Sequence, residues 1–195
     1  GLGDVYKRQK LNNVLLDAKT RKALCVIDLD TVMPGSSLYD FGDSIRFGAA
    51  TAAEDERDLS RMEMSLERFR VFTRGYVRSC PGLTQKELEL LPLGAKTMTM
   101  ECGVRFLTDY LDGDHYFAVH RDGQNLDRAR TQFRLVADME KKWNEMQKIV
   151  AEEANKLISS YSAYTPEAKD LFMLGYKAGD RITIGGWIGE TTTIR

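Results

Sequence analysis

The sequence predicts an α+β protein that is mostly helical, in which one β-hairpin leads into a helical body. Two short apolar runs of β-prone residues, 13–17 and 23–28, flank the polar string DAKTRK and predict the hairpin. After them, apolar residues recur every three or four positions along much of the chain, which is typical of amphipathic helices. The sequence contains no internal repeat with a period of about 20–50 residues, so a solenoid is not expected.

Length and composition indicate one domain, or one lobe of a larger enzyme. The chain has 195 residues, of which 43% are hydrophobic and 29% charged, as in ordinary globular proteins. A formal net charge of -1 argues against a nucleic-acid partner or an anionic membrane surface. The sequence has no apolar run of about 18 residues, so no membrane span is expected. The three cysteines are far apart, and we expect reduced thiols in a cytoplasmic protein.

The first half of the helical body is expected to hold two helices. One lies near 38–49, after a turn at Pro34-Gly35. The other spans about 59–79 and is stopped by Pro81-Gly82.

The second half contains clearer signals. Residues 84–87 form a capping box, in which a Thr hydroxyl and a Glu carboxylate each accept a bond from an amide at a helix start. An amphipathic helix that ends at Asp112-Gly113-Asp114 is marked by Met100, Val104, Leu107 and Leu111. A long helix over roughly 124–150 is marked by Leu126, Ala129, Phe133, Val136 and Trp143. The positions of Met98, Met100 and Trp143 are expected in the core.

We divide the chain into three segments. Residues 1–9 form a polar leader of non-native appearance, without the apolar region of a secretory signal, and we expect the native chain to begin well before residue 10. Residues 10–150 form the main lobe, and residues 151–195 form a tail to which we assign no role. Within that tail a helix is expected over 166–176, followed by a strand-like, glycine-rich end.

The segment 26–43 contains four aspartates, and one of them fits a metal site. Magnesium prefers oxygen ligands, usually one or two carboxylates with an amide oxygen. In kinase-like catalytic lobes these are an Asn that ends the catalytic loop and an Asp that follows the next strand. Asn13 and Asp28 have this layout, fifteen residues apart across the predicted hairpin. Asp30 is a second ligand or a hydrogen-bond acceptor in the same interpretation, whereas a strand-end carboxylate that caps a turn is the alternative for Asp28.

Two strings imitate kinase motifs without the matching context. Asp40 opens a DFG string but lies beyond the Pro-Gly turn, in a segment expected to be helical. The string HRDGQN at 120–125 resembles the start of a catalytic loop, yet the fifth residue after Asp122 is Asp127 instead of Asn. We therefore expect His120 and Asp122 to be solvated or capping residues.

Several long strings of the chain resemble the N-acetylhexosamine 1-kinases. They are KLNNVLLD, VIDLDTVMPGSSLYDFGDSIRFGA, MECGVRFLTDYLDGDHYF and HRDGQNLDRARTQFRLVADMEKKW. These kinases belong to the aminoglycoside-phosphotransferase and choline-kinase-like group of the protein-kinase fold. The resemblance covers residues 10 to about 148 and implies that the chain is the C-terminal lobe of such a fold, with its hairpin carrying the metal ligands.

The resemblance also shows a departure at the catalytic base. In the family, the motif H-N-D-T-K-x-N-N precedes the hairpin, and its Asp is the base. Lys10, Asn12 and Asn13 match the end of this motif, but Tyr6 and Arg8 occupy the positions of the His and the Asp. Arginine stays protonated and cannot deprotonate a sugar hydroxyl. The chain also has no Gly-rich loop followed by a strand lysine, so the N-terminal lobe that holds ATP is expected as a missing intramolecular partner.

The resemblance implies that Arg105 and Tyr116 contact the sugar. An Arg can donate paired hydrogen bonds to hydroxyl groups, and a Tyr can stack on a pyranose ring. The alternative for Arg105 is an i,i+4 ion pair with Glu101 or Asp109 on a solvated helix face. Supporting roles are expected for Asp40, through hydrogen bonds to the catalytic loop, and for Asp43 and Arg46, as a local pair or at the pocket border.

The predicted activity is ATP- and Mg²⁺-dependent phosphorylation of the anomeric hydroxyl of N-acetylglucosamine or N-acetylgalactosamine, with the chain itself an inactive fragment. One alternative is a related kinase for choline, homoserine or an aminoglycoside. Cationic substrates of that kind need an acidic pocket, whereas Arg105 favours a neutral sugar. The other alternative is a non-catalytic, pseudokinase-like binding module.

Overall fold

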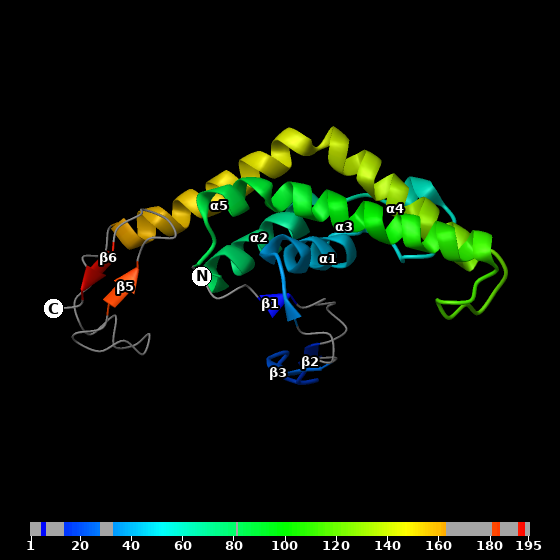
Figure 1. Cartoon of the computed structure of the whole chain (residues 1–195), viewed down its shortest axis with the longest axis horizontal. Coiled ribbons are helices and arrows are strands. Elements are labelled where there is room, and N and C mark those ends of the chain that lie inside the picture. Colours follow the sequence, from blue (N-terminus) through cyan, green and yellow to red (C-terminus); the bar gives the residue numbers. More distant parts are fainter. Residues whose placement is uncertain are drawn as a thin grey trace.

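The structure is a computed structural model that describes residues 5–6, 14–27, 33–80, 82–162, 181–183 and 191–193. This part of the chain is mostly helical with small antiparallel sheets, which confirms the predicted α+β class (Figure 1). Its helices are α1 (Ser37–Gly48), α2 (Leu66–Ser79), α3 (Gln85–Asp112), α4 (Gln124–Lys141) and α5 (Trp143–Ser162). Its strand pairs are β1 (Val5–Tyr6) with β4 (Met33–Pro34), β2 (Val14–Leu16) with β3 (Ala23–Val26), and β5 (Arg181–Thr183) with β6 (Thr191–Thr193).

The long helix α3 is the centre of the helical body. Helices α1 and α4 pack against it, and α5 packs against both α3 and α2 (Figure 1). The core that these helices enclose includes Phe41, Met62, Met64, Phe69, Leu91, Leu135, Met139 and Met146. None of the helices in the described part of the chain is both long and apolar enough to cross a bilayer.

The predicted hairpin is confirmed as β2 and β3, with Val14 opposite Val26. Its connecting loop is held by Asp17, whose Oδ1 accepts hydrogen bonds from the backbone N–H groups of Lys19 (3.1 Å) and Thr20 (2.6 Å). An Asp that bonds the amides two and three residues ahead is a common way to close such a turn. The strand-like character predicted for the chain end is found in β5 and β6, whereas the helix predicted at 166–176 lies outside the described residues.

Helix α1 confirms the helix predicted near 38–49 and explains the DFG string. Ser36 is its N-cap, with a side chain that accepts a hydrogen bond from Leu38 N at 3.3 Å. Phe41 is fully buried, and Gly42 faces α3 so closely that an added Cβ would overlap the carbonyl group of Gly94. The glycine therefore allows two helix backbones to approach each other.

The helix predicted over 59–79 is wrong in its first part. Only a short 3₁₀ turn, η2 (Leu59–Arg61), precedes an extended segment, and α2 begins after the N-cap Ser65. In the extended segment Met62 and Met64, two residues apart, both have fully buried side chains. The alternation of Met with polar residues is a strand-like period that places both side chains in the core. An isolated bridge between Ala50 and Met64 fixes this segment.

The single helix predicted over 124–150 is two helices, α4 and α5. The chain turns at Lys142, the C-cap of α4. The ammonium group of Lys142 donates hydrogen bonds to the carbonyl oxygen of Met64 (2.9 Å) and to Asp138 Oδ2 (2.7 Å). This turn directs α5 across α2, which a continuous helix would not reach.

Helix α3 begins at the predicted capping box. Glu87 N donates to the Thr84 hydroxyl at 3.2 Å, and Thr84 N donates to Glu87 Oε2 at 2.7 Å. The helix runs without interruption to Asp112 and ends at Gly113, whose positive φ of 100° suits glycine. The predicted end at Asp112-Gly113-Asp114 is thus confirmed.

The expectation that Met100 is a core residue is wrong. Met100 is 42% exposed, and Val104 and Leu111 on the same stripe are 50% and 75% exposed. Helix α3 buries a different face, because the small residues Gly94 and Gly103 allow α1 and α4 to pack there. A hydrophobicity pattern does not register glycines of this kind. Met98 is buried as predicted, and Trp143 is half-buried.

The close contact of α1 with α3 generates a stability prediction. We expect Gly42→Ala to lower the free energy of unfolding by about 2 kcal/mol, because the new methyl group overpacks the helix crossing. Chemical denaturation monitored by circular dichroism measures this loss. Gly75→Ala is the matched control, since an added Cβ at Gly75 meets no atom within 4 Å. We expect it to raise stability by up to about 1 kcal/mol. Equal effects at the two glycines would contradict the close contact.

A buried carboxylate joins α5 to α2. Glu153 accepts hydrogen bonds from Arg74 Nε (2.9 Å), Lys156 Nζ (2.9 Å) and Arg70 Nη1 (3.1 Å). The bond from Arg74 is the largest cause that lowers the pKa of Glu153, and despite the opposing effect of burial the pKa falls from 4.5 to about 2. Since the folded pKa is depressed, Glu153 stabilises the fold above pH 4.5 and loses this contribution as the pH falls toward 2.

We therefore expect Glu153→Gln to destabilise the protein by roughly 2 kcal/mol at pH 7, because two arginines lose a charged partner. The difference between wild type and variant should shrink as the pH is lowered below about 4.5, which urea denaturation at several pH values measures. Glu152→Gln, which changes a more exposed partner of Arg70, should cost less than about 1 kcal/mol. A pH-independent difference for Glu153→Gln would contradict the prediction.

Candidate functional site

Some of the predicted site residues lie outside the described part of the chain. These are Arg8, Lys10, Asn13, Asp28 and Asp30. What the structure does show is the register of the hairpin between them. Val14 pairs with Val26, so the start of β2 and the end of β3 lie at the same end of the hairpin. In the sequence, Asn13 directly precedes Val14, and Asp28 follows Val26 by two residues.

The described side chains do not themselves form a metal site. Among them, no group of three or more His, Cys, Asp and Glu side chains is placed to hold an ion. Asn13 and Asp28, which the sequence predicts as ligands of Mg²⁺, are not among the side chains to which this finding applies.

Helix α1 contains the supporting residues predicted from the DFGD string. Asp40 lies in its first turn, where a negative charge interacts favourably with the helix N-terminus. Asp43 and Arg46 form the predicted local pair, with 2.8 Å between Arg46 Nε and Asp43 Oδ1. Both side chains are almost completely buried, so Arg46 is a structural residue of the interior and does not border an open pocket.

The charge of Arg46 is balanced from two further segments. Its Nη1 donates to Glu54 Oε1 at 2.6 Å and to Gln132 Oε1 at 3.4 Å. Burial opposes the charged form, but Asp43 and Glu54 outweigh it and hold the pKa of Arg46 above its ordinary value. Arg46 therefore remains a cation that ties α1 to the 49–58 loop and to α4.

Arg105 and Tyr116 lie in contact at the C-terminal end of α3. Arg105 Nη2 donates to the Tyr116 hydroxyl at 3.3 Å. The guanidinium carbon lies 5.4 Å from the centroid of the Tyr116 ring and 5.3 Å from that of Phe117, within the range of cation–π attraction. We call these three residues the Arg105 cluster. The structure thus brings together the two residues that the resemblance assigned to the sugar.

The Arg105 cluster combines a cation with an accessible aromatic surface. Tyr116 is 73% exposed, and the Arg105 side chain is 30% exposed. The i,i+4 ion pair with Glu101 considered for Arg105 is also present, at 3.5 Å. At that length and exposure the ion pair with Glu101 contributes little to holding Arg105.

The backbone that carries Tyr116 is held by a buried carboxylate. Asp109 Oδ1 accepts a hydrogen bond from Tyr116 N (2.7 Å), and Asp109 Oδ2 accepts one from Phe117 N (2.9 Å). Burial raises the pKa of Asp109, but these backbone bonds together with one from His115 outweigh it and leave the pKa below its usual value. Asp109 is therefore a carboxylate at neutral pH and does not pair with Arg105 as the sequence allowed.

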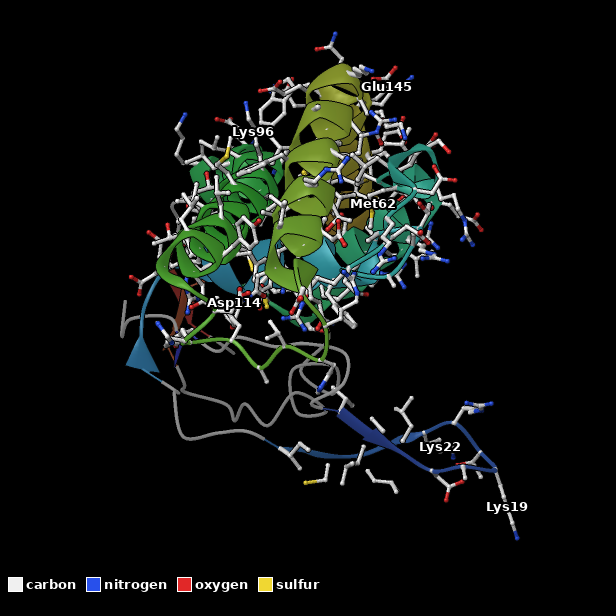
Figure 2. The ribbon with its side chains drawn as sticks, turned by 90° about the vertical axis from the view of Figure 1, so that its right-hand side faces the viewer. Lys19, Lys22, Met62, Lys96, Asp114 and Glu145 are labelled. Carbon is white, nitrogen blue, oxygen red and sulfur yellow. The ribbon has the colours of Figure 1, made fainter. Side chains whose placement is uncertain are left out.

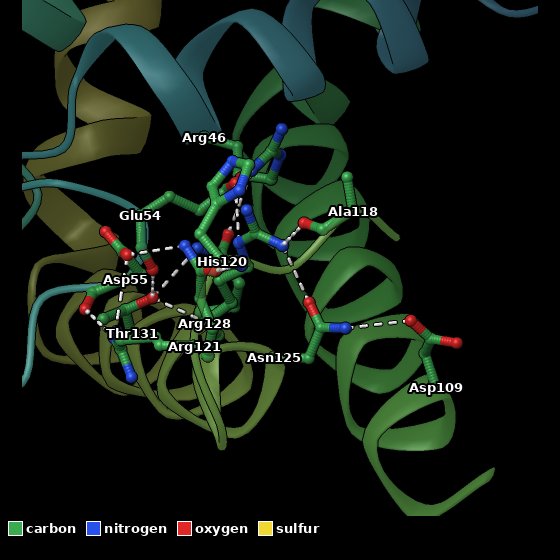
Figure 3. Close-up of polar contacts among 12 residues, drawn as sticks. Arg46, Glu54, Asp55, Asp109, Ala118, His120, Arg121, Asn125, Arg128 and Thr131 are labelled. Atoms are coloured by element: carbon green, nitrogen blue, oxygen red, sulfur yellow. Dashed lines mark hydrogen bonds and ion pairs between the residues drawn. The ribbon is translucent and has the colours of Figure 1, made fainter. Parts of the chain in front are cut away.

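The HRDGQN string opens α4, as predicted, and its exposed and buried residues differ in role. His120 and Asp122 are exposed, which confirms their assignment as solvated residues. Gln124 is buried and accepts a hydrogen bond from His120 N at 2.7 Å, while its Nε2 donates to Asp55 Oδ2 at 2.9 Å. Asn125 is fully buried beside Asp109 (Figure 3).

Sequence reasoning did not predict the roles of Asp109 and Asn125, although it considered Asp109 as a partner of Arg105. Their only local signal is position, since Asp109 is one helical turn after Arg105 and Asn125 starts the helix after the loop. In Figure 2 the α3–α4 loop, at Asp114, and the β2–β3 hairpin, at Lys19 and Lys22, lie below the helical body, whereas Figure 1 shows the loop at the right-hand end of the helices, to the side of the hairpin.

A scan of the chain against models of known protein families finds no match.

Proposed function

We propose that residues 10–150 form the substrate-binding, C-terminal lobe of an ATP-dependent sugar kinase that phosphorylates the anomeric hydroxyl of N-acetylhexosamines. The proposal rests on the strings shared with the N-acetylhexosamine 1-kinases and on the geometry of the Arg105 cluster. The single observation that carries it is the contact between Arg105 and Tyr116, the two residues that the resemblance assigns to the sugar.

The Arg105 cluster has the chemistry that recognition of a neutral sugar needs. A pyranose offers an apolar face for an aromatic ring and hydroxyl groups around its edge. Tyr116 supplies an exposed ring with a hydroxyl group at its tip, and the fork of Arg105 supplies several N–H donors. The rings of Phe117 and Tyr116 form a T-shaped pair, with 4.8 Å between their centroids.

The same cluster disfavours the cationic substrates of related kinases. An ammonium group of choline or of an aminoglycoside that approached Tyr116 would meet the charge of Arg105, at 5.4 Å from the ring centroid. Like charges at such a distance repel each other unless carboxylates intervene. Asp109 uses both its oxygens to accept backbone hydrogen bonds. Glu101 does pair with Arg105, but at 3.5 Å and on an exposed face, where such a pair offsets little of the charge. A neutral sugar is therefore the substrate class that we infer.

The hairpin supplies the other half of the proposed site. Asn13 and Asp28 would hold Mg²⁺, which neutralises charge on the phosphate oxygens of bound ATP. The pairing of Val14 with Val26 supports this assignment, because it leads both chain segments away from the same end of the hairpin. Asp30 and Lys10 are within three residues of these ligands in the sequence, and we assign them supporting roles.

Transfer also needs a base and a nucleotide lobe. Arg8 stands where the family has the catalytic Asp, so we propose that the chain as given binds sugar but does not phosphorylate it. A non-catalytic, pseudokinase-like module is the alternative. It predicts the same binding, but no turnover when the Asp and the nucleotide lobe are supplied.

Sugar binding by the chain is tested by isothermal titration calorimetry with N-acetylglucosamine. We expect measurable affinity in the wild type and at least a tenfold higher Kd in Arg105→Ala, because the variant loses the N–H donors and the support of the Tyr116 ring. A tenfold change in Kd corresponds to about 1.4 kcal/mol.

Glu101→Gln is the matched control. It removes the 3.5 Å ion pair to Arg105 without changing the cluster, so its Kd should stay within about twofold of the wild type. A flat titration of a well-folded wild-type chain, or equal affinity in Arg105→Ala, would reject the proposed sugar site.

A further inference from the structure

The α3–α4 loop depends on one buried amide, that of Asn125. Asn125 is 0% exposed, and its Nδ2 donates hydrogen bonds to Asp109 Oδ2 at 2.8 Å and to Asp114 Oδ1 at 2.9 Å. Its Oδ1 accepts a hydrogen bond from Arg128 Nη1 at 2.8 Å. One side chain thus joins the end of α3, the loop and α4 (Figure 3).

The two carboxylates that Asn125 bonds, Asp109 and Asp114, each influence the backbone that leads to Tyr116. Asp109 receives the amides of Tyr116 and Phe117, so its orientation decides where the backbone of Tyr116 lies. Asp114 has a positive φ of 60°, a left-handed conformation that is costly for most side chains and tolerated by Asp. The bond from Asn125 stabilises Asp114 in that turn.

Asn125 also neutralises a conflict between two carboxylates. Asp109 and Asp114 both approach the same Nδ2 group, within 2.9 Å, and would repel each other without a donor between them. The amide has two N–H groups, one for each carboxylate. A side chain that could only accept hydrogen bonds could not replace Asn125, because Asp109 and Asp114 both need a donor.

The orientation of the Asn125 amide is itself fixed. Arg128 Nη1, which donates to Asn125 Oδ1, also donates to the carbonyl oxygen of Ala118 at 3.1 Å. Arg128 lies over the ring of Phe106 at 5.5 Å and 3.9 Å from Glu54 Oε2. Because Arg128 can only donate, it sets which end of the amide faces the two carboxylates.

We propose that Asn125 is a positioning residue for sugar binding: it holds Asp109 and Asp114 together and so presents Tyr116 and Arg105 to the substrate. This inference rests on the proposed function for the role of Tyr116. Asn125 is buried and reaches the sugar only through Asp109 and the loop backbone. Replacing Asn125 should therefore raise the Kd for the sugar while the helical body stays folded.

The test variant is Asn125→Asp, which keeps the shape of the side chain and removes both donors. Its matched control is Thr73→Val, an equally buried change of similar shape in α2 that removes a 2.8 Å hydrogen bond to Phe69 O. Three quantities are measured for the full chain: the thermal midpoint, the Kd for N-acetylglucosamine, and the hydrogen-exchange rates of the Tyr116 and Phe117 amides by NMR.

In the wild type we expect both amides to exchange slowly, since Asp109 accepts them. In Asn125→Asp we expect their exchange to accelerate at least tenfold and the sugar Kd to rise at least tenfold. Thr73→Val should lower the thermal midpoint while leaving the Kd within about twofold and these two amides unchanged.

The outcomes separate this inference from the proposed function. Unchanged exchange of the two amides in Asn125→Asp would overturn the inference whether or not sugar binds. Accelerated exchange with an unchanged Kd would also overturn it. The absence of sugar binding by the folded wild type would reject the proposed function, and with it a role of Asn125 in binding. In that case, faster exchange of the two amides in Asn125→Asp would still show that Asn125 holds the loop.

Discussion

The burial of the Arg46 guanidinium is the constraint on which the arrangement of the helices depends. A buried cation is costly by several kcal/mol unless charged and polar partners surround it. Here the partners come from three segments: Asp43 from α1, Glu54 from the 49–58 loop and Gln132 from α4. Helix α4 and the loop must therefore lie where Arg46 requires them, and removal of any one segment would leave the charge incompletely compensated.

The contacts of Arg46 also fix the position of the candidate site. Glu54 faces both Arg46 and Arg128, and Arg128 donates to Asn125. From Asn125 the contacts continue to Asp109, which fixes the backbone that carries the exposed Tyr116 (Figure 3). The exposed Tyr116 is thus supported by a buried chain of polar contacts that begins in α1. Hydrogen bonds in a buried network restrict side-chain positions, although Arg46 Nη2 makes none here.

Sequence reasoning succeeded where a feature depends on neighbours along the chain. The hairpin, the capping box at Thr84 and the helix end at Gly113 are each decided within a few residues, and each is confirmed. It failed where a distant segment decides the conformation. The chain is extended around Met62 because the core accepts alternate side chains there, and it turns at Lys142 because that ammonium group reaches Met64 O.

The same distinction applies to the candidate site. Arg105 and Tyr116 were assigned from the resemblance, and they are in contact. The roles of Asp109 and Asn125 were not predicted, because they depend on the loop folding back between two helices, which no local pattern encodes. The DFG string is also explained by packing, since Gly42 lies at the α1–α3 contact.

The measurement that tests the central claim most directly is ADP release by a protein in which a nucleotide lobe ending in the base motif H-N-D-T replaces residues 1–9. It would be assayed with N-acetylglucosamine, N-acetylgalactosamine, galactose, choline and kanamycin. The sugar-kinase account predicts turnover of the two acetamido sugars by that protein and none by the 195-residue chain. A well-folded protein with the lobe and motif in place that turns over none of these substrates, or only the cationic ones, would contradict it.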